Sequence, residues 1–319
     1  GSSISSCKKA LCESLLVPIR RRQNWTTVVL LSRSLLGFTL FISVWLLCGV
    51  SRAKQGAANE EEILLLGLTD TMAFRLSMEP FDADVDPDAT ALIIIDMQRD
   101  FLEPGGFGES LGNDVGLLQR CVPRVEACID ACRERGIGLI YTREGHRPDM
   151  SDVFPRKLQQ IDDDGNVRRF IGEDGPMGRI LIRGEPGHEI VRDVEPIEGE
   201  PIIDKPGKGS FYGTDLELIL KSRNISTLLV CGVTTEVCVQ TTIREANDRG
   251  FRAICVGDAC ASYNEDFHYA SLAMISAQGG IFGSVTDSVR LVEALGFPRP
   301  EYAEEECEEE PEIVVEEEE

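Results

Sequence analysis

Short apolar runs rich in β-branched residues alternate, from Ala89 onward, with segments whose apolar residues recur at helical spacing. This alternation is typical of a parallel sheet that is covered by helices on both faces. Strands are predicted at 91–95, 138–142, 201–204, 227–231, 252–256 and 281–284, and helices at 113–135, 214–222, 236–249, 265–278 and 286–295. The expected fold class is α/β, a three-layer, doubly wound domain with a mostly parallel six-stranded sheet.

The pattern changes at both ends of the chain. Residues 34–50 carry no charge and are flanked by basic residues, which favours a membrane anchor or an organelle-targeting signal, with a cleaved secretory signal as a third interpretation. We therefore expect residues 1–58 to be a basic leader that anchors or targets the chain, and 59–84 to be a linker. Residues 85–299 are the expected globular domain, and 300–319 are expected to be a disordered Glu-rich tail.

Charge is unevenly distributed over these segments. The 319 residues include 32 Lys and Arg against 55 Asp and Glu, a formal net charge of -23. The leader contributes +7 and the tail -12, so residues 59–299 carry -18. Because nucleic-acid binders hold phosphate groups with clustered Lys and Arg, this acidic domain excludes a nucleic-acid partner.

Cysteine and glycine spacing narrow the chemistry further. The eleven cysteines include Cys128 and Cys132, one helical turn apart, and Cys231 and Cys255 within apolar runs, without paired CxxC motifs. We expect most of them to be buried thiols in a reducing compartment. No GxGxxG sequence follows the first strand and no phosphate-binding P-loop is present, which disfavours a nucleotide-dependent enzyme, and no cofactor is expected.

Three predicted strands lead into a chemically reactive residue at the edge of the sheet where ligands bind. Asp96 ends the first strand and is a candidate proton acceptor, and Lys205 follows the third strand, where an ammonium group can stabilise a thiolate. Cys238 lies in the first turn of a helix, whose unpaired N–H groups favour a thiolate nucleophile. The alternative interpretation of Asp96 is a cap or a salt-bridge partner, that of Lys205 is an exposed surface lysine, and that of Cys238 is a buried structural cysteine.

Residues 85–297 resemble the isochorismatase-like cysteine hydrolases in three motifs: IIIDMQRDF with Asp96, DKPGKGSFYGTDLE with Lys205 and Phe211, and CGVTTEVCVQTT with Cys238. Within that family, residues 142–149, 178–187, 197–211 and 277–285 resemble the biuret amidohydrolases. The resemblance implies a Cys238 nucleophile, an Asp96 base and an activating Lys205. It also implies a homo-oligomer, commonly a tetramer.

The resemblance further implies how a small urea-type substrate is held. Lys208 and Gln278 would bind substrate carbonyl oxygens, Phe101 would line the pocket, and the backbone N–H groups of Thr234 and Cys238 would form an oxyanion hole. A cis peptide bond is implied between Val233 and Thr234. The implied reaction converts biuret to allophanate and ammonia through a covalent cysteine intermediate.

Two other functions stay open. One is a related carbamoyl amidase acting on ureidoacrylate, N-carbamoylsarcosine or triuret, and the other is a catalytically idle binding protein on the same fold. A metal is not expected, because nicotinamidases of the superfamily bind one through an Asp and paired histidines. This chain contains His146, His188 and His268 without a matching HxxxxH pair.

Overall fold

The computed structural model describes residues 72–158, 160–161, 167–168 and 170–303. The predicted leader 1–58 and residues 304–319 of the predicted tail lie outside these residues. In the part of the chain that is described, no helix is long and apolar enough to cross a membrane. The expectation of a membrane-anchored protein is corrected by this finding, and residues 34–50, on which it rested, lie outside the described residues.

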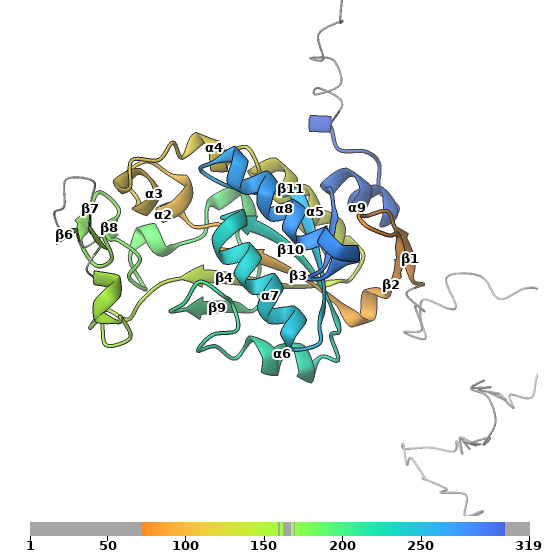
Figure 1. The fold of residues 1–319 in the computed structure, drawn as a ribbon, viewed down its shortest axis with the longest axis horizontal. Helices are drawn as coiled ribbons and strands as arrows, with labels where there is room; N and C mark the ends of the chain where they lie inside the picture. Colours follow the sequence, from red (N-terminus) through yellow and green to blue (C-terminus); the bar gives the residue numbers. More distant parts are fainter. Residues whose placement is uncertain (1–71, 159, 162–166, 169, 304–319) are drawn as a thin grey trace, which may run out of the picture. The chain divides into compact units, whose positions relative to one another are not determined.

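A six-stranded parallel sheet forms the centre of the domain (Figure 1), as predicted. Its strands, in spatial order, are β12 (Ser284–Thr286), β11 (Arg252–Ala261), β10 (Thr227–Val233), β3 (Thr90–Ile95), β4 (Gly138–Glu144) and β9 (Ile202–Lys205). The chain moves outward from β3 to β9 in one direction and from β10 to β12 in the other. The direction of winding therefore reverses between β3 and β10, and α/β sheets bind ligands at such a point, beyond the carboxyl ends of the strands.

The central strand β3 shows why the sheet is covered on both faces. All six of its residues are buried, because successive side chains of a strand point to opposite sides. Leu92 and Ile94 pack into one core cluster, and Ile93 and Ile95 pack into a second cluster on the other face. A strand buried on both faces reads as a continuous apolar run, which is the pattern seen in the sequence.

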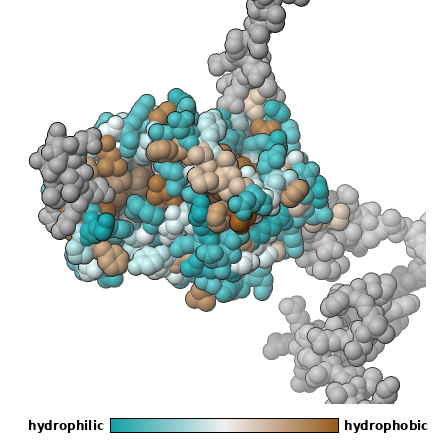
Figure 2. Space-filling model, in the orientation of Figure 1, coloured by the Kyte–Doolittle hydropathy of each residue, from teal (hydrophilic) through white to brown (hydrophobic). Residues whose placement is uncertain are grey.

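Helices cover both faces of the sheet, as the doubly wound prediction requires. One core cluster includes residues of α5 (Val122–Glu134) and α9 (Ser288–Ala294), and the other includes residues of α6 (Leu216–Ser222), α7 (Gln240–Asp248) and α8 (Glu265–Gly280). The predicted helix 113–135 is divided into α4 (Gly116–Gln119) and α5, and the one at 236–249 begins with a π-helical turn at Thr235–Val239. Figure 2 shows apolar side chains exposed over α8 in a mostly hydrophilic face.

Shorter elements complete the domain. They are η1 (Pro87–Ala89), α2 (Arg99–Leu102), α3 (Phe107–Ser110), η2 (Pro155–Leu158), η3 (Pro186–His188) and η4 (Arg192–Val194), with the strand pairs β5 (Gln160–Ile161) and β6 (Val167–Arg168), and β7 (Asp174–Gly175) and β8 (Gly178–Arg179). Most of them lie in the long connection from β4 to β9. The sequence pattern left this connection without predicted structure, because its apolar residues have no regular period.

The domain extends beyond the boundaries expected from the sequence. β1 (Phe74–Leu76) and β2 (Ala83–Val85) form an antiparallel pair in which Leu76 is fully buried, and Glu79 exchanges backbone hydrogen bonds of 2.8 and 2.9 Å with Val285. Residues 74–84 are therefore part of the packed domain, which corrects their assignment to a linker. At the other end, the Tyr302 hydroxyl lies 2.6 Å from that of Ser288, so packing continues past residue 299.

Candidate active site

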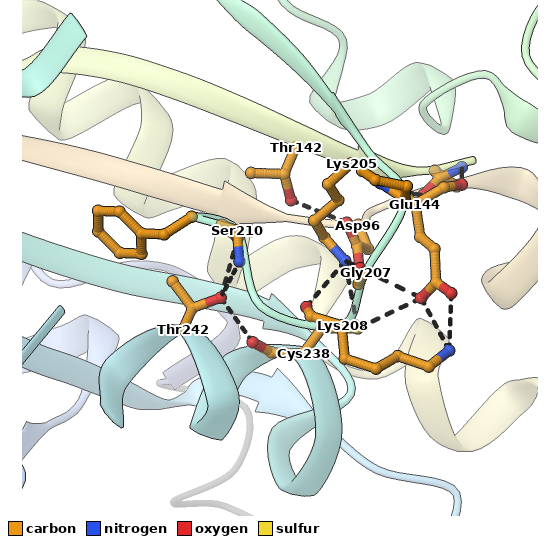
Figure 3. A network of polar contacts seen from close by, with 12 residues as sticks. Asp96, Thr142, Glu144, Lys205, Gly207, Lys208, Ser210, Cys238 and Thr242 are labelled. Atoms are coloured by element: carbon orange, nitrogen blue, oxygen red, sulfur yellow. Dashed lines mark hydrogen bonds and ion pairs between the residues drawn. The ribbon is translucent and has the colours of Figure 1, made fainter. Parts of the chain in front are cut away.

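Parallel strands bring four ionisable side chains to one edge of the sheet (Figure 3). Asp96 follows β3, Glu144 ends β4, Lys205 ends β9, and Cys238 lies in the π-helical turn after β10. All four side chains are buried, although charged groups in such places are costly unless they are paired. The sequence predicted three of them, Asp96, Lys205 and Cys238, and the fold brings those three together.

Lys205 lies at the centre of this cluster. Its Nζ is 2.7 Å from Asp96 Oδ2 and 3.4 Å from Cys238 Sγ, and it also donates to the carbonyl oxygens of Gly207 and Lys208 at 3.1 and 3.0 Å. Burial lowers the pKa of the Lys205 ammonium, but the negative charge of Asp96 and its other acidic neighbours outweighs burial, so this pKa ends above its usual value. Lys205 is therefore a fixed positive charge beside the thiol.

Asp96 is held in one orientation by its neighbours. Its Oδ1 accepts a hydrogen bond of 2.8 Å from the Thr142 hydroxyl on β4, and its backbone N–H donates to the Thr142 carbonyl at 3.1 Å. Its φ of +49° lies in the left-handed region, which Asp tolerates better than most residues. The chain therefore turns sharply at the end of β3, and the second carboxylate oxygen faces Lys205.

Burial is the largest influence on the pKa of the Cys238 thiol and favours its protonated form. Burial raises the pKa of Cys238 well above its usual value, and the nearby positive charge of Lys205 acts in the opposite direction. The thiol donates to Glu144 Oε2 at 3.6 Å, and reactive atoms of Asp96, Glu144 and Cys238 all lie within 4.8 Å of one another. A nucleophilic thiolate therefore requires transfer of the proton to one of these carboxylates.

The turn that presents Cys238 depends on close contact between neighbouring strands. Gly232 has a φ of +107°, and a Cβ atom there would lie 2.1 Å from the Ile95 carbonyl oxygen, so a side chain cannot fit. The peptide bond between Val233 and Thr234 is cis, as the family resemblance implied. Thr242 donates to the Cys238 carbonyl at 2.7 Å, which ties the π-helical turn to α7.

Glu144 is a site residue that sequence reasoning missed. Both of its carboxylate oxygens accept from Lys208 Nζ, at 2.7 and 3.0 Å, and Gln98 bonds to both its backbone N–H and its carbonyl. Burial raises the pKa of Glu144, but the charges of Lys208 and Lys205 outweigh it, so this pKa ends below its usual value. The available signal was an ionisable residue at the end of a buried strand, the same feature that identified Asp96.

A pocket of about 390 Å³ opens above the thiol. Of the residues predicted to contact substrate or form the oxyanion hole, Phe101, Lys208, Thr234 and Cys238 line it. Gln278 does not: it is exposed near the far end of α8, whereas Asn264 and Phe267 at the start of that helix are at the pocket. The helical geometry of α8 breaks at Ala277, and Gln278 has a left-handed φ of +53°. The structure does not place Gln278 in the lining of this pocket, and its implied substrate contact stays a prediction.

Among the described residues, Asp96, Glu144 and Cys238 are grouped closely enough to ligate a metal ion. Lys205 Nζ lies 2.7, 3.9 and 3.4 Å from their nearest atoms, so its ammonium group already supplies a positive charge there. The histidines lie outside this group, and the absence of a metal stays a prediction.

All seven cysteines of the described chain are buried free thiols, as expected: Cys121, Cys128, Cys132, Cys231, Cys238, Cys255 and Cys260.

The strand order and the cysteine after the central strand β10 are features of the isochorismatase-like α/β class. The chain belongs to the isochorismatase family, since the model of the isochorismatase domain matches residues 90–287. Ureidoacrylate amidohydrolase RutB of Methylobacterium radiotolerans is 28% identical over 224 residues, which are 70% of this chain and 86% of that protein. The protein of the same name from Acinetobacter baylyi is 26% identical over 218 residues, 68% of this chain and 88% of that protein.

Solved structures show the same fold. A cysteine hydrolase from Pseudomonas syringae pv. phaseolicola has a TM-score of 0.55 and 29% identity, and the match covers 66% of this chain and 94% of that one. An isochorismatase family protein from Desulfovibrio vulgaris has a TM-score of 0.52 and 26% identity, with 65% and 98% covered. These similarities confirm the predicted family and fold class.

Proposed function

We propose that this chain is a cysteine amidohydrolase that cleaves a urea-type C–N bond, with biuret as its substrate and allophanate and ammonia as products. The observation that carries the proposal is the buried contact of Cys238 Sγ with Lys205 Nζ at 3.4 Å, beside Asp96 at 2.7 Å from the same ammonium group. A buried thiol next to a fixed positive charge and a carboxylate is suited to nucleophilic attack on a carbonyl. Membership of the isochorismatase family and the two similar amidohydrolases support amide hydrolysis.

In the proposed reaction, the Cys238 thiol gives its proton to Asp96, and Lys205 stabilises the thiolate. The sulfur attacks a substrate carbonyl carbon, and the negative charge that develops on its oxygen is held by the backbone N–H groups of Thr234 and Cys238. The C–N bond then breaks, and the leaving nitrogen takes a proton from Asp96 and departs as ammonia. Water then gives a proton to Asp96 and attacks the remaining carbonyl, and the C–S bond breaks. Asp96 returns this proton to the departing sulfur, which restores the Cys238 thiol and completes the cycle.

Ureidoacrylate is the second candidate substrate, because both curated relatives described above are ureidoacrylate amidohydrolases. Triuret and N-carbamoylsarcosine share the same carbamoyl group and the same chemistry. An idle binding protein is not favoured, since Asp96, Lys205 and Cys238 lie in mutual contact range. Assembly into a tetramer stays a prediction.

The test is ammonia release from biuret, triuret, ureidoacrylate and N-carbamoylsarcosine by the purified chain. We expect turnover of biuret and its loss in Cys238→Ser, with Cys231→Ser as the matched control, because Cys231 is a buried thiol that does not line the pocket. Unfolding curves show whether each variant remains folded. Full activity in folded Cys238→Ser, or no release from any of the four compounds, would refute the proposal.

A further inference from the structure

Two glutamates line the pocket, and one carboxylate oxygen of the second lacks a hydrogen-bond partner among the described residues. Glu144 and Glu236 both line it, and Glu236 Oε2 is buried without a hydrogen-bond partner among the described residues. An ionised carboxylate can only accept hydrogen bonds, and a buried acceptor left unpaired is costly. Glu236 therefore places an acceptor that no described residue uses in the wall of the pocket.

The described charged residues that line the pocket are Glu144, Lys208 and Glu236, and the first two are paired with each other. Of the described residues that line it, Lys208 is cationic, and it is bound to both oxygens of Glu144. Below the pocket, Lys205 is paired with Asp96 at 2.7 Å. Lys157 adds a further positive charge that acts on Glu144, whereas Glu236 Oε2 has no hydrogen-bond partner among the described residues. No arginine is among the described lining residues.

The position of Glu144 beside the nucleophile adds a second acceptor. Its Oε2 is 3.6 Å from Cys238 Sγ, so a carbonyl carbon in contact with the sulfur brings its amino substituents close to this carboxylate. Two bonds to Lys208 leave part of the acceptor capacity of Glu144 unused, because a carboxylate has about four lone-pair sites. Gln98 fixes the backbone of Glu144, so the acceptor is held in place.

We propose that Glu144 and Glu236 make this site selective for uncharged substrates that present N–H groups, and that Glu236 excludes substrates that carry a carboxylate. This inference rests on the proposed function and specifies its substrate class. Biuret is neutral and has an amino group at each end, so it can donate to both acceptors. Ureidoacrylate has a carboxylate at one end, which would enter a pocket whose lining residues include two glutamates and one lysine.

The first test compares kcat/KM for biuret and ureidoacrylate in wild type, Glu236→Gln and Asp266→Asn. Asp266 is the matched control, an exposed acid in the first turn of α8 outside the pocket lining. We expect wild type to prefer biuret by on the order of 100-fold, Glu236→Gln to narrow that ratio by about tenfold, and Asp266→Asn to leave it unchanged. Equal use of both substrates by wild type, or an unchanged ratio in Glu236→Gln, would overturn the inference.

A second test does not depend on turnover and separates this inference from the proposed function. Iodoacetamide is neutral with an amide N–H donor, and iodoacetate is a carboxylate of similar size. Both alkylate Cys238 with loss of iodide, and peptide masses report the modified residue. Relative to a free cysteine thiol, we expect wild type to discriminate against iodoacetate by at least tenfold, and Glu236→Gln to remove most of that discrimination. If wild type discriminates between iodoacetamide and iodoacetate no more than a free thiol does, charge selection is refuted even where biuret is hydrolysed. If wild type discriminates against iodoacetate but hydrolyses none of the compounds, only the proposed reaction is refuted.

Discussion

Replacing Lys205 with methionine removes an ammonium group that contacts both Asp96 and Cys238 while keeping most of the side-chain volume. Lys205 is fully buried, and its Nζ lies 2.7 Å from Asp96 and 3.9 Å from Glu144. The variant therefore leaves two buried carboxylates with less compensating charge. Breaking a buried ion pair from one side costs about 3–5 kcal/mol of unfolding free energy.

That loss of stability has a thermal and a pH signature. For a domain of this size, about 3–5 kcal/mol corresponds to a melting temperature lower by roughly 6–20 °C. In the folded variant, one of these two carboxylates binds a proton that the same group releases in the unfolded chain. The free energy of unfolding of the variant therefore falls as pH rises above about 4. Urea unfolding of wild type and Lys205→Met at pH 5 and pH 7.5 measures both effects, and we expect the larger difference at pH 7.5.

Activity should fall independently of stability. A positive charge 3.4 Å from the sulfur is worth about 5 kcal/mol to a thiolate at an effective dielectric constant of about 20, so kcat should drop by at least about 100-fold. The double variant Lys205→Met with Asp96→Asn removes both charges, and it should recover most of the stability without recovering activity. Lys221→Met, which breaks an exposed pair with Glu217, is the matched control and should cost less than about 1 kcal/mol.

A loss below about 1 kcal/mol at pH 7.5 in Lys205→Met would show that Lys205 does not compensate buried charge. A double variant that is even less stable than Lys205→Met would contradict the assignment of Asp96 as its main partner. A folded Lys205→Met enzyme with near wild-type kcat would refute the role of the ammonium group in stabilising the thiolate.

Three further predictions concern the surroundings of the site. Burial raises the pKa of Asp100 from 3.8 to about 6. Its contribution to the free energy of unfolding, about 3 kcal/mol, is therefore present below pH 4 and is lost as pH rises through 6. Asp100→Asn should remove this component from the pH dependence of urea unfolding, and an unchanged curve would contradict it. Thr142→Val removes the hydroxyl donor to Asp96 and should lower kcat about tenfold with stability reduced by about 1.5–3 kcal/mol; unchanged kinetics would show that this bond does not position the carboxylate. Leu229→Ala, at a fully buried position of β10, should cost about 2–5 kcal/mol in urea unfolding, and a cost under 1 kcal/mol would mean that the core refills the cavity.

Local sequence determined the fold class because burial imposes a recognisable period on each element. The continuous apolar run of β3 arises from a strand covered on both faces, and the predicted strands at 91–95, 138–142, 201–204, 227–231 and 252–256 all overlap strands of the sheet. Each of the three predicted reactive residues lies at or just beyond the end of a strand, and parallel strands bring such ends to one edge. The last strand was predicted too early, at 281–284, and forms at Ser284–Thr286.

Tertiary structure alone decided the partners of these residues. Glu144 enters the site because β4 lies between β3 and β9, so its carboxylate comes within 3.6 Å of a sulfur 94 positions away in the sequence. Lys208, expected to hold substrate, is bound to Glu144, and Gln278 lies at the exposed end of α8. Spacing along the chain fixes which residues can reach an edge of the sheet, but the order of strands, set by packing across the whole domain, fixes which of them meet.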